Sequence, residues 1–358
     1  MAPPEPTEAR PDVTVVMPIR NEGAFLAKSL GAVLDQDYPA DRMEVIVADG
    51  MSDDGTREAV EALRRKHPNL VLLDNSGRIV ATGLNAAIRR ARGEYVVRVD
   101  GHTEIAADYV RRCVEALERT GADNAGGRMT AVGGGPFGEA VALATSSPFG
   151  VGGARFHYSE REEWVDTVYL GAWRREVFDR IGVFDEELVR DQDDEFNYRL
   201  RAAGGRILLT PAVKSLYTVR GRPARLWRQY FEYGLWKVRV LQKHPRQMQP
   251  RQFVPPAFAA TLAALAAASP FSSAARWGLG GVAGAYAAAN LAAAASVSRR
   301  RPARFPLVSL AFAILHLSYG FGFLTGLFRF AGRWEDPRAR LARLRPAGEP
   351  GAVVGEEP

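Results

Sequence analysis

The chain has 358 residues, enough for one sizeable α/β domain and an appendage, and its 47% hydrophobic and 25% charged residues are ordinary for a folded protein. A single cysteine, Cys113, excludes an intramolecular disulfide, and we expect it to be a small core residue. The first residues are rich in proline and glutamate and contain no apolar run. They predict a disordered lead-in over 1–12 instead of a secretory signal.

Short apolar runs alternate with helical patterns through the first 210 residues. We expect strands at 13–17, 44–48, 70–73, 94–99 and 206–210, and helices at 24–34, 56–66, 83–91, 174–181 and 194–203. Such alternation predicts βαβ units with right-handed crossovers and helices on both faces of the sheet. The glycine-rich stretch 126–136 has no regular pattern, and we predict no element there.

The chain turns apolar from residue 253 to residue 330, with stretches at 255–268, 277–297 and 306–328. The second and third are long enough to cross a bilayer, which needs roughly 20 residues. We therefore expect a membrane region at 254–330 with about three crossings, followed by a polar tail at 331–358. The alternative is a buried helical hairpin in a soluble domain.

Positive charge is concentrated just before this region. Residues 212–254 contain ten lysines and arginines and one acidic residue. A basic stretch beside apolar segments suits the anionic cytoplasmic leaflet, and no nucleic-acid motif is present, so we expect a basic amphipathic interfacial segment at 212–253 and no nucleic-acid partner.

The arginines limit how the chain can cross the membrane. Positive charge favours a cytoplasmic position for residues 299–301, as it does for the basic segment before the first apolar stretch. Three crossings then leave the arginine-rich stretch 329–345 outside, against the positive-inside rule. Two crossings and a re-entrant third stretch keep all the basic clusters inside, but the length of the third stretch favours three crossings.

Acidic segments follow the predicted strands in a fixed order. They lie at residues 18–22, 49–56, 100–102 and 191–195. Each alone could be a turn or a helix cap. Together they predict a site at the carboxyl edge of the sheet, where α/β proteins bind ligands. Sugar transfer from a nucleoside diphosphate needs such groups: acceptors for the base and ribose, ligands for a cation, and a general base.

Individual residues suit these roles. Asp49 can accept a hydrogen bond from a uracil-like ring edge, and Asp100 with His102 can approach ribose and metal together. An imidazole ligand favours Mn²⁺ over strict Mg²⁺ selectivity, unless His102 only donates a hydrogen bond to another ligand. Asp193 is the candidate base, with a pKa raised by its acidic neighbours unless a metal or arginine offsets them; the alternative is an acidic helix start.

These motifs resemble glycosyltransferase family 2 with the GT-A fold over roughly residues 13–240, and especially its membrane-bound exopolysaccharide enzymes of the succinoglycan type. The matching segments are 15–22, 47–56, 83–87, 91–94, 97–103, 171–176 and 192–200. The resemblance implies an α/β, Rossmann-like GT-A catalytic domain at 13–211 and an inverting, single-displacement transfer.

The resemblance also implies residue roles. Asp100 and His102 occupy the Asp-x-Asp place at diphosphate and divalent metal, and Asp193 occupies the place of the catalytic aspartate. The nucleotide-sugar contacts it implies are Pro18, Asn21, Glu22, Asp49, Arg78, Asn85 and Asp100. A plain helical role for Asn85 is the alternative.

Two positions depart from the usual family pattern. His102 stands where a second acid is usual, and Gln192 where a glutamate often precedes the catalytic aspartate, which leaves Mn²⁺ and Mg²⁺ both open. Residues 229–234 match the Gln-x-x-Arg-Trp motif of processive members only loosely, which argues against processive synthesis.

The function predicted from the sequence is transfer of a hexose from a nucleotide sugar, UDP-linked by expectation, to a lipid-linked or polysaccharide acceptor in exopolysaccharide or cell-envelope glycan synthesis. The predicted location is the cell membrane, multi-pass, with the catalytic domain on the cytoplasmic side. One alternative is glycosylation of a polyprenyl phosphate to give an activated sugar lipid. The other is a catalytically silent membrane scaffold of a glycan assembly.

Overall fold

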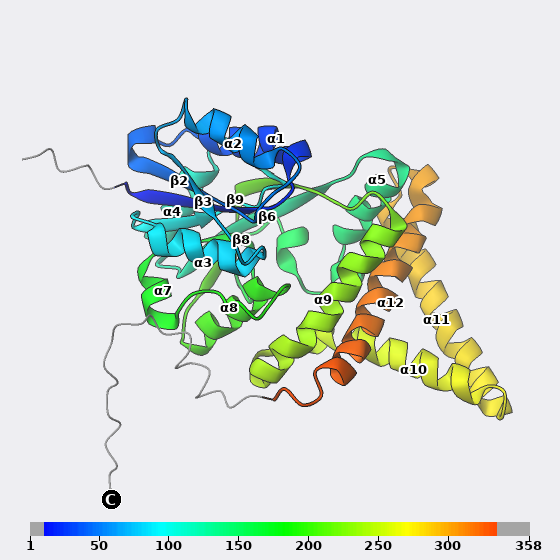
Figure 1. The fold of residues 1–358 in the computed structure, drawn as a ribbon. Coiled ribbons are helices and arrows are strands. Elements are labelled where there is room, and N and C mark those ends of the chain that lie inside the picture. Colours follow the sequence, from blue (N-terminus) through cyan, green and yellow to red (C-terminus); the bar gives the residue numbers. More distant parts are fainter. Residues whose placement is uncertain (1–10, 335–358) are drawn as a thin grey trace, which may run out of the picture.

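The computed structural model describes residues 11–334. A mixed α/β domain holds one twisted sheet, and long helices lie to one side of it (Figure 1). Most of the predicted lead-in and nearly all of the predicted polar tail fall outside the described residues.

The sheet has nine strands, and its first half is parallel. The strands are β1 (Val13–Ile19), β2 (Met43–Asp49), β3 (Leu70–Asp74), β4 (Tyr95–Arg98), β5 (Thr103–Ile105), β6 (Asn124–Val132), β7 (Glu163–Val165), β8 (Tyr169–Arg174) and β9 (Ile207–Thr218). Their order is β3-β2-β1-β4-β8-β6-β9-β5, and β7 pairs with β9. The predicted strands are all present, and the parallel set β3-β2-β1-β4 forms the βαβ units that the alternation predicted.

Helices cover both faces of this sheet, as Figure 1 shows. On one face α1 (Gly23–Leu34), α2 (Thr56–Arg64) and α4 (Tyr109–Thr120) enclose a core that includes Cys113. On the other face lie α3 (Val80–Arg90), α7 (Glu176–Ile181) and α8 (Gln192–Ala202). Every residue of β1 and β2 is buried, because parallel strands between two helical layers have no solvent face.

The region around residues 126–136 is regular, contrary to the sequence analysis. It contains most of β6 and the start of α5 (Gly135–Thr145), and the short helix α6 (Pro148–Val151) follows. Glycines in this stretch predicted an interruption of regular structure, but they allow β6 to pack closely on β9. A Cβ on Gly127 would lie 1.8 Å from the Val213 carbonyl oxygen. A strand interior needs glycine where another backbone approaches this closely.

The segment predicted to begin at residue 212 begins inside β9, which continues to Thr218. The basic stretch then forms α9 (Pro223–Lys243), which packs along α12 (Phe305–Arg329). Two glycines bring the helix backbones together: a Cβ on Gly234 would lie 2.0 Å from the Tyr319 carbonyl oxygen, and one on Gly322 would lie 2.0 Å from that of Phe231.

The three predicted apolar stretches are all helical, but they differ in length and surroundings. They are α10 (Val254–Ala268), α11 (Ser273–Val297) and α12. By length and composition, two helices among the described residues could cross a membrane: Ser273–Val297, with 11% of its most apolar window buried, and Pro302–Arg329, with 50% buried. The 15-residue α10 falls below that length.

Trp173 is a central side chain of the core between the sheet and α8. Its side chain is 2% exposed and packs edge-on against Phe178, Phe184 and Phe196. We expect Trp173→Ala to lower the free energy of unfolding by about 3–5 kcal/mol, because it removes a large buried ring and leaves a cavity. Trp164→Ala is the matched control: that ring is half exposed and contacts Arg206, so its loss should cost about 1 kcal/mol or less. Equal effects in denaturant unfolding would contradict this.

Candidate active site

The loops after β1 and β2 are joined by a two-way hydrogen bond. Asn21 donates from Nδ2 to Asp53 Oδ1 at 2.9 Å, and its Oδ1 accepts from the Asp53 backbone N at 3.1 Å. The Asn21 backbone N also donates to Ser52 Oγ at 2.9 Å. Asn21 has a positive φ of 55°, which asparagine tolerates better than most residues. Two of the predicted acidic segments therefore lie side by side.

Asp49 ends β2 with its carboxylate fully buried. Oδ1 accepts from Ser52 Oγ at 2.5 Å, and Oδ2 lies 3.3 Å from Nη1 of Arg57, which also pairs with Asp74 at 2.8 Å. A buried carboxylate needs such partners, and they fix the direction of its oxygens. Asp49 is thus a rigid acceptor whose two oxygens are engaged by Ser52 and Arg57.

His102, in the turn after β4, contacts the loop after β1. Its Nδ1 lies 3.1 Å from Oε1 of Glu22, and its ring lies edge-on to Tyr217 with centroids 5.5 Å apart. When Glu22 accepts the Nδ1 proton, Nε2 becomes the free lone-pair nitrogen, the usual arrangement for a histidine that binds a metal. Glu22 therefore orients His102.

Arg98 holds Asp100 from the end of the same strand. Its Nε and Nη2 donate to the two oxygens of Asp100 at 2.8 and 3.1 Å. Burial lowers the pKa of the Arg98 guanidinium, but the Asp100 and Asp193 carboxylates raise it by more. One buried cation therefore acts on both carboxylates, although they lie 93 positions apart in the chain.

Asp193 lies in the first turn of α8, and its Oδ1 accepts from the backbone N of Asp194 at 2.9 Å. Burial raises the pKa of the Asp193 carboxyl, Asp194 raises it further, and Arg98 and Lys237 oppose the shift. A carboxylate with raised proton affinity is a better general base near neutral pH than an exposed one.

Lys237 of α9 reaches the segment that holds Asp193. Its Nζ lies 3.1 Å from Asp191 Oδ1 and also pairs with Asp194 Oδ2, and its side chain is only 4% exposed. Burial raises the pKa of Asp191 to about 7, with Asp194 and Asp193 adding to the shift and Lys237 opposing it. The helix after the sheet therefore contributes directly to the electrostatics of the acidic cluster.

The structure also places the three remaining residues that the sequence proposed for the site. Asn85 is buried, and its side chain is engaged by Phe184 and Glu186: Nδ2 donates to Phe184 O and Glu186 Oε1, and Oδ1 accepts from Phe184 N. This matches its alternative, structural role. Pro18 lies within β1 opposite Ala48, and Arg78 is exposed in the turn before α3 with a φ of 59°.

The donor set for a cation is small. Within residues 11–334 no group of three or more His, Cys, Asp or Glu side chains could hold a metal by itself. Asp100 and His102 Nε2 remain as two candidate donors, one oxygen and one nitrogen, with Glu22 behind the imidazole. Two donors fit a cation that takes its remaining ligands from a bound diphosphate, as Mg²⁺ commonly does.

Sequence reasoning assigned no role to Arg98 or Lys237. Arg98 interrupts the apolar run of β4, and a lone charge in a buried strand is a usable signal. In the sequence, Lys237 is one of many basic residues of the stretch 212–253. Its burial depends on contacts of α9 with the distant segment around Asp191 and Asp194. Tyr169 and Tyr217 also border Asp100 and His102, and Gln229 donates to the Tyr217 hydroxyl at 3.0 Å.

Known proteins share this sequence pattern. The family model for glycosyl transferase family 2 matches residues 14–182. The succinoglycan biosynthesis protein ExoA of Rhizobium meliloti is 32% identical over 328 residues, which cover 89% of this chain and 96% of that protein. The chain belongs to glycosyl transferase family 2.

Two further comparisons concern this family 2 glycosyltransferase. A Methanococcus voltae enzyme, dolichyl N-acetyl-alpha-D-glucosaminyl phosphate 3-beta-D-2,3-diacetamido-2,3-dideoxy-beta-D-glucuronosyltransferase, is 25% identical over 64% of this chain and 74% of that enzyme. The structure of the Pyrobaculum calidifontis mannosyltransferase PcManGT, solved with GDP-Man and Mn²⁺, superposes with a TM-score of 0.58 at 25% identity, covering 88% of this chain and 87% of that one. The predicted GT-A fold is confirmed.

Asp191 gives this glycosyltransferase a testable pH dependence. Its folded-state pKa of about 7 lies above the ordinary value of 3.8. The protonated carboxyl therefore stabilises the fold fully below about pH 4, and that contribution is lost as the pH rises through 7. We expect the wild type to lose stability relative to Asp191→Asn over this range, by up to about 4 kcal/mol.

Denaturant unfolding of both proteins at several pH values between 4 and 8 measures this difference. The exposed Asp179, replaced by asparagine, is the control and should follow the wild type at every pH. A constant difference between wild type and Asp191→Asn would contradict the raised pKa.

Proposed function

We propose that the protein is an inverting glycosyltransferase that moves a hexose from a UDP-linked donor to a lipid-linked or polysaccharide acceptor in exopolysaccharide or cell-envelope glycan synthesis. The observation that carries the proposal is the buried Arg98, which binds Asp100 and acts on Asp193. It links the proposed diphosphate side of the site to the proposed base.

The donor nucleotide is assigned to the edge of β2. Asp49, held by Ser52 and Arg57, accepts from the N3–H of uracil. Pro18 lies near the end of β1, Asn21 and Glu22 follow that strand, and Arg78 follows β3. A guanine ring also presents N–H donors, and the similar mannosyltransferase was solved with GDP-Man. The experiment below therefore includes both classes of donor.

The diphosphate is assigned to Asp100 and His102. They would hold a divalent metal, Mn²⁺ or Mg²⁺, which neutralises the charge of the departing nucleoside diphosphate. Support comes from the free Nε2 of His102 behind Glu22 and from the Mn²⁺ in the similar mannosyltransferase. Arg98 holds Asp100 through both carboxylate oxygens, so these oxygens are preorganised for this task.

Asp193 is the proposed catalytic residue. Its carboxylate takes the proton of the acceptor hydroxyl as that oxygen attacks the anomeric carbon from the face opposite the diphosphate. The new C–O bond forms, the bond to the leaving phosphate oxygen breaks, and the anomeric configuration inverts. Burial raises the pKa of the Asp193 carboxyl, and Arg98 and Lys237 oppose that shift.

The acceptor proposal rests on what the relatives are named for. One acts in succinoglycan biosynthesis, and the other acts on a dolichyl-linked sugar phosphate. A lipid-linked acceptor also accounts for the exposed apolar helices. Transfer to a polyprenyl phosphate itself is the second candidate. The raised pKa of Asp193, beside Asp191 and Asp194 that pair with Lys237, argues against a silent scaffold, which has no use for a base.

The location proposed is the cytoplasmic face of the cell membrane. The exposed apolar surface of α11 and the arginines at the ends of α11 and α12 support membrane association. The sequence predicted a multi-pass chain, and two helices have the length for it. The contacts of α12 with the catalytic domain favour a different arrangement.

Asp193→Asn tests the proposal. Membranes containing the full-length protein receive radiolabelled UDP-sugars and GDP-sugars with Mn²⁺, and label in the organic-extractable and polysaccharide fractions is counted. We expect Asp193→Asn to lose about 10²–10⁴-fold in transfer, the usual contribution of a general base. Binding of UDP should be unchanged, because the base does not contact the nucleotide.

Asp179→Asn is the matched control and should keep full transfer. The acid lability of the labelled lipid separates sugar phosphates from sugar diphosphates, and so distinguishes the two acceptor candidates. Equal transfer by Asp193→Asn and the wild type would remove Asp193 as base. UDP binding without transfer to any fraction by the wild type would favour the scaffold.

A further inference from the structure

Helix α12 is bound to the catalytic domain at three levels. Before its start, Arg301 and Arg304 pair with Glu139 of α5 at 2.8 and 3.1 Å. In its middle, His316 Nε2 lies 2.8 Å from the carbonyl oxygen of Phe149 in α6. After its end, Arg333 lies 3.7 Å from Glu187 in the loop before α8. Both ends of α12 therefore lie on the same side as the catalytic domain.

The helix beside α12 is also unsuited to lipid. Along α9, Lys237, Arg239 and Lys243 are at most 5% exposed, and they pair with acidic residues at 185–194 of the catalytic domain. The glycine contacts leave no gap between α9 and α12. A bilayer around α12 would have to admit these buried ion pairs, whose removal from polar surroundings is costly.

Helices α10 and α11 behave differently. Helix α10 leaves beside the later part of α12, α11 returns beside its start near α5, and the two meet at a turn far from the sheet, as Figure 1 shows. At the turn Phe271 is 91% and Trp277 is 83% exposed. At about 1.5 Å per residue, α10 is roughly 22 Å long, shorter than the bilayer core of about 30 Å. The base of α10 also returns to the domain, because Arg251 pairs with Asp166.

We infer that the α10–α11 hairpin is the part of the described chain that enters the bilayer and that α12 does not cross it. The hairpin leaves and re-enters the face that carries the catalytic domain. Arg251, Arg301 and Arg333 then all lie on that face, which satisfies the positive-inside rule that three crossings would violate. The apolar side chains at the turn, which the protein itself leaves uncovered, then contact lipid.

Single cysteines in a Cys113→Ala background test this arrangement in the full-length protein. We choose Arg65→Cys on the exposed end of α2 as reference, Arg299→Cys after α11, and Arg333→Cys after α12. A membrane-impermeant maleimide should label all three in inside-out vesicles and none in intact cells. Labelling of Arg333→Cys from the opposite side would mean that α12 crosses the bilayer and would overturn the inference.

A second label tests the hairpin itself. An environment-sensitive fluorophore on Phe271→Cys should emit at shorter wavelength when the protein is in liposomes than when it is in detergent-free buffer. The turn is surrounded by lipid in the first sample and by water in the second. The same fluorophore on Arg65→Cys should not shift. No shift at Phe271, or opposite labelling of Arg299→Cys, contradicts the hairpin.

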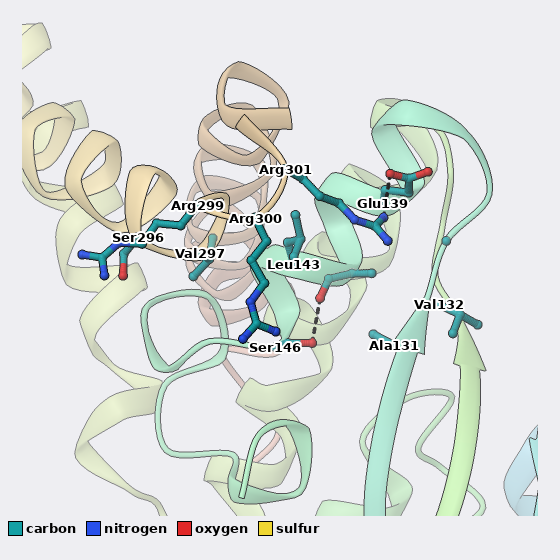
Figure 2. A pocket seen from close by; sticks show the side chains of 12 residues that line it. Ala131, Val132, Glu139, Leu143, Ser146, Ser296, Val297, Arg299, Arg300 and Arg301 are labelled. Atoms are coloured by element: carbon teal, nitrogen blue, oxygen red, sulfur yellow. Dashed lines mark hydrogen bonds and ion pairs between the residues drawn. The ribbon is translucent and has the colours of Figure 1, made fainter. Parts of the chain in front are cut away.

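A basic cavity lies at the base of this hairpin. Its volume is about 770 Å³, and it lies between α5, the end of β6 and the end of α11. Figure 2 shows Arg301 reaching Glu139 and Arg300 extending toward Ser146. Within residues 11–334, neither Arg299 nor Arg300 has a carboxylate partner. Alanine, valine and leucine side chains form much of the remaining lining.

We propose that this cavity binds the phosphate of a membrane lipid. A guanidinium without a partner suits a phosphate, and apolar walls suit the chain attached to it. One strand pair connects the cavity to the proposed active site: Ala131, in its lining, pairs in register with Tyr217, whose ring lies edge-on to His102. Either an anionic phospholipid or a polyprenyl phosphate presents this chemistry.

Two soluble probes separate these sources. Dihexanoyl-phosphatidylglycerol and farnesyl phosphate are titrated against the detergent-solubilised full-length protein. We expect Arg300→Gln to weaken binding about fivefold, the effect of one basic residue near an anionic surface, and Arg300→Lys to retain most of it. Arg65→Gln is the charge-matched control and should bind as the wild type does.

Weakening of farnesyl phosphate alone assigns the cavity to the acceptor lipid, and weakening of both assigns it to lipid phosphate in general. UDP binding, measured on the same samples, reports whether each variant is folded, so that failure here is distinct from failure of the proposed transferase. Unchanged affinity for both probes in folded Arg300→Gln overturns the proposal.

Discussion

The buried guanidinium of Arg98 is the charge on which the arrangement of the site depends. Three acidic groups, Asp100, Asp191 and Asp193, come within a region largely shielded from water, and their mutual repulsion would separate them without compensation. Arg98 supplies positive charge from β4, and Lys237 supplies it from α9. Removing the cation that pairs with a buried carboxylate strongly destabilises a protein. The fold and the site therefore both depend on Arg98 and Lys237.

The second cation extends this dependence beyond the α/β domain. Lys237 is followed on α9 by Arg239 and Lys243, which bind Glu187 and Asp185 in the loop before α8. The loop that leads to Asp193 is therefore held by a helix that itself packs on α12. In this glycosyltransferase the helices that follow the sheet are a structural part of the catalytic unit, because they carry the countercharges of its acidic loop.

Much of this molecule could be predicted from the sequence, for physical reasons. Buried parallel strands such as β1 and β2 are continuous apolar runs, and acids at their ends mark the ligand-binding edge, so the parallel half of the sheet and the family were predictable. The region of β6 and α5 was not, because Gly127 signals a break in a single sequence and a close strand contact only in three dimensions. The burial of Lys237 and the hydrogen bonds of Asn85 were missed for the same reason: both depend on partners far away in the chain.

The contact between Gly322 and Phe231 has a consequence for how sequence variation in the last helix is interpreted. Any side chain at position 322 would meet a carbonyl oxygen of α9 and displace one helix from the other. Since α9 carries Lys237, the displacement would reach the acidic loop some 130 positions earlier in the sequence. A methyl group added to an apolar helix would thus impair sugar transfer without altering a polar residue, and the defect could be mistaken for one of membrane insertion.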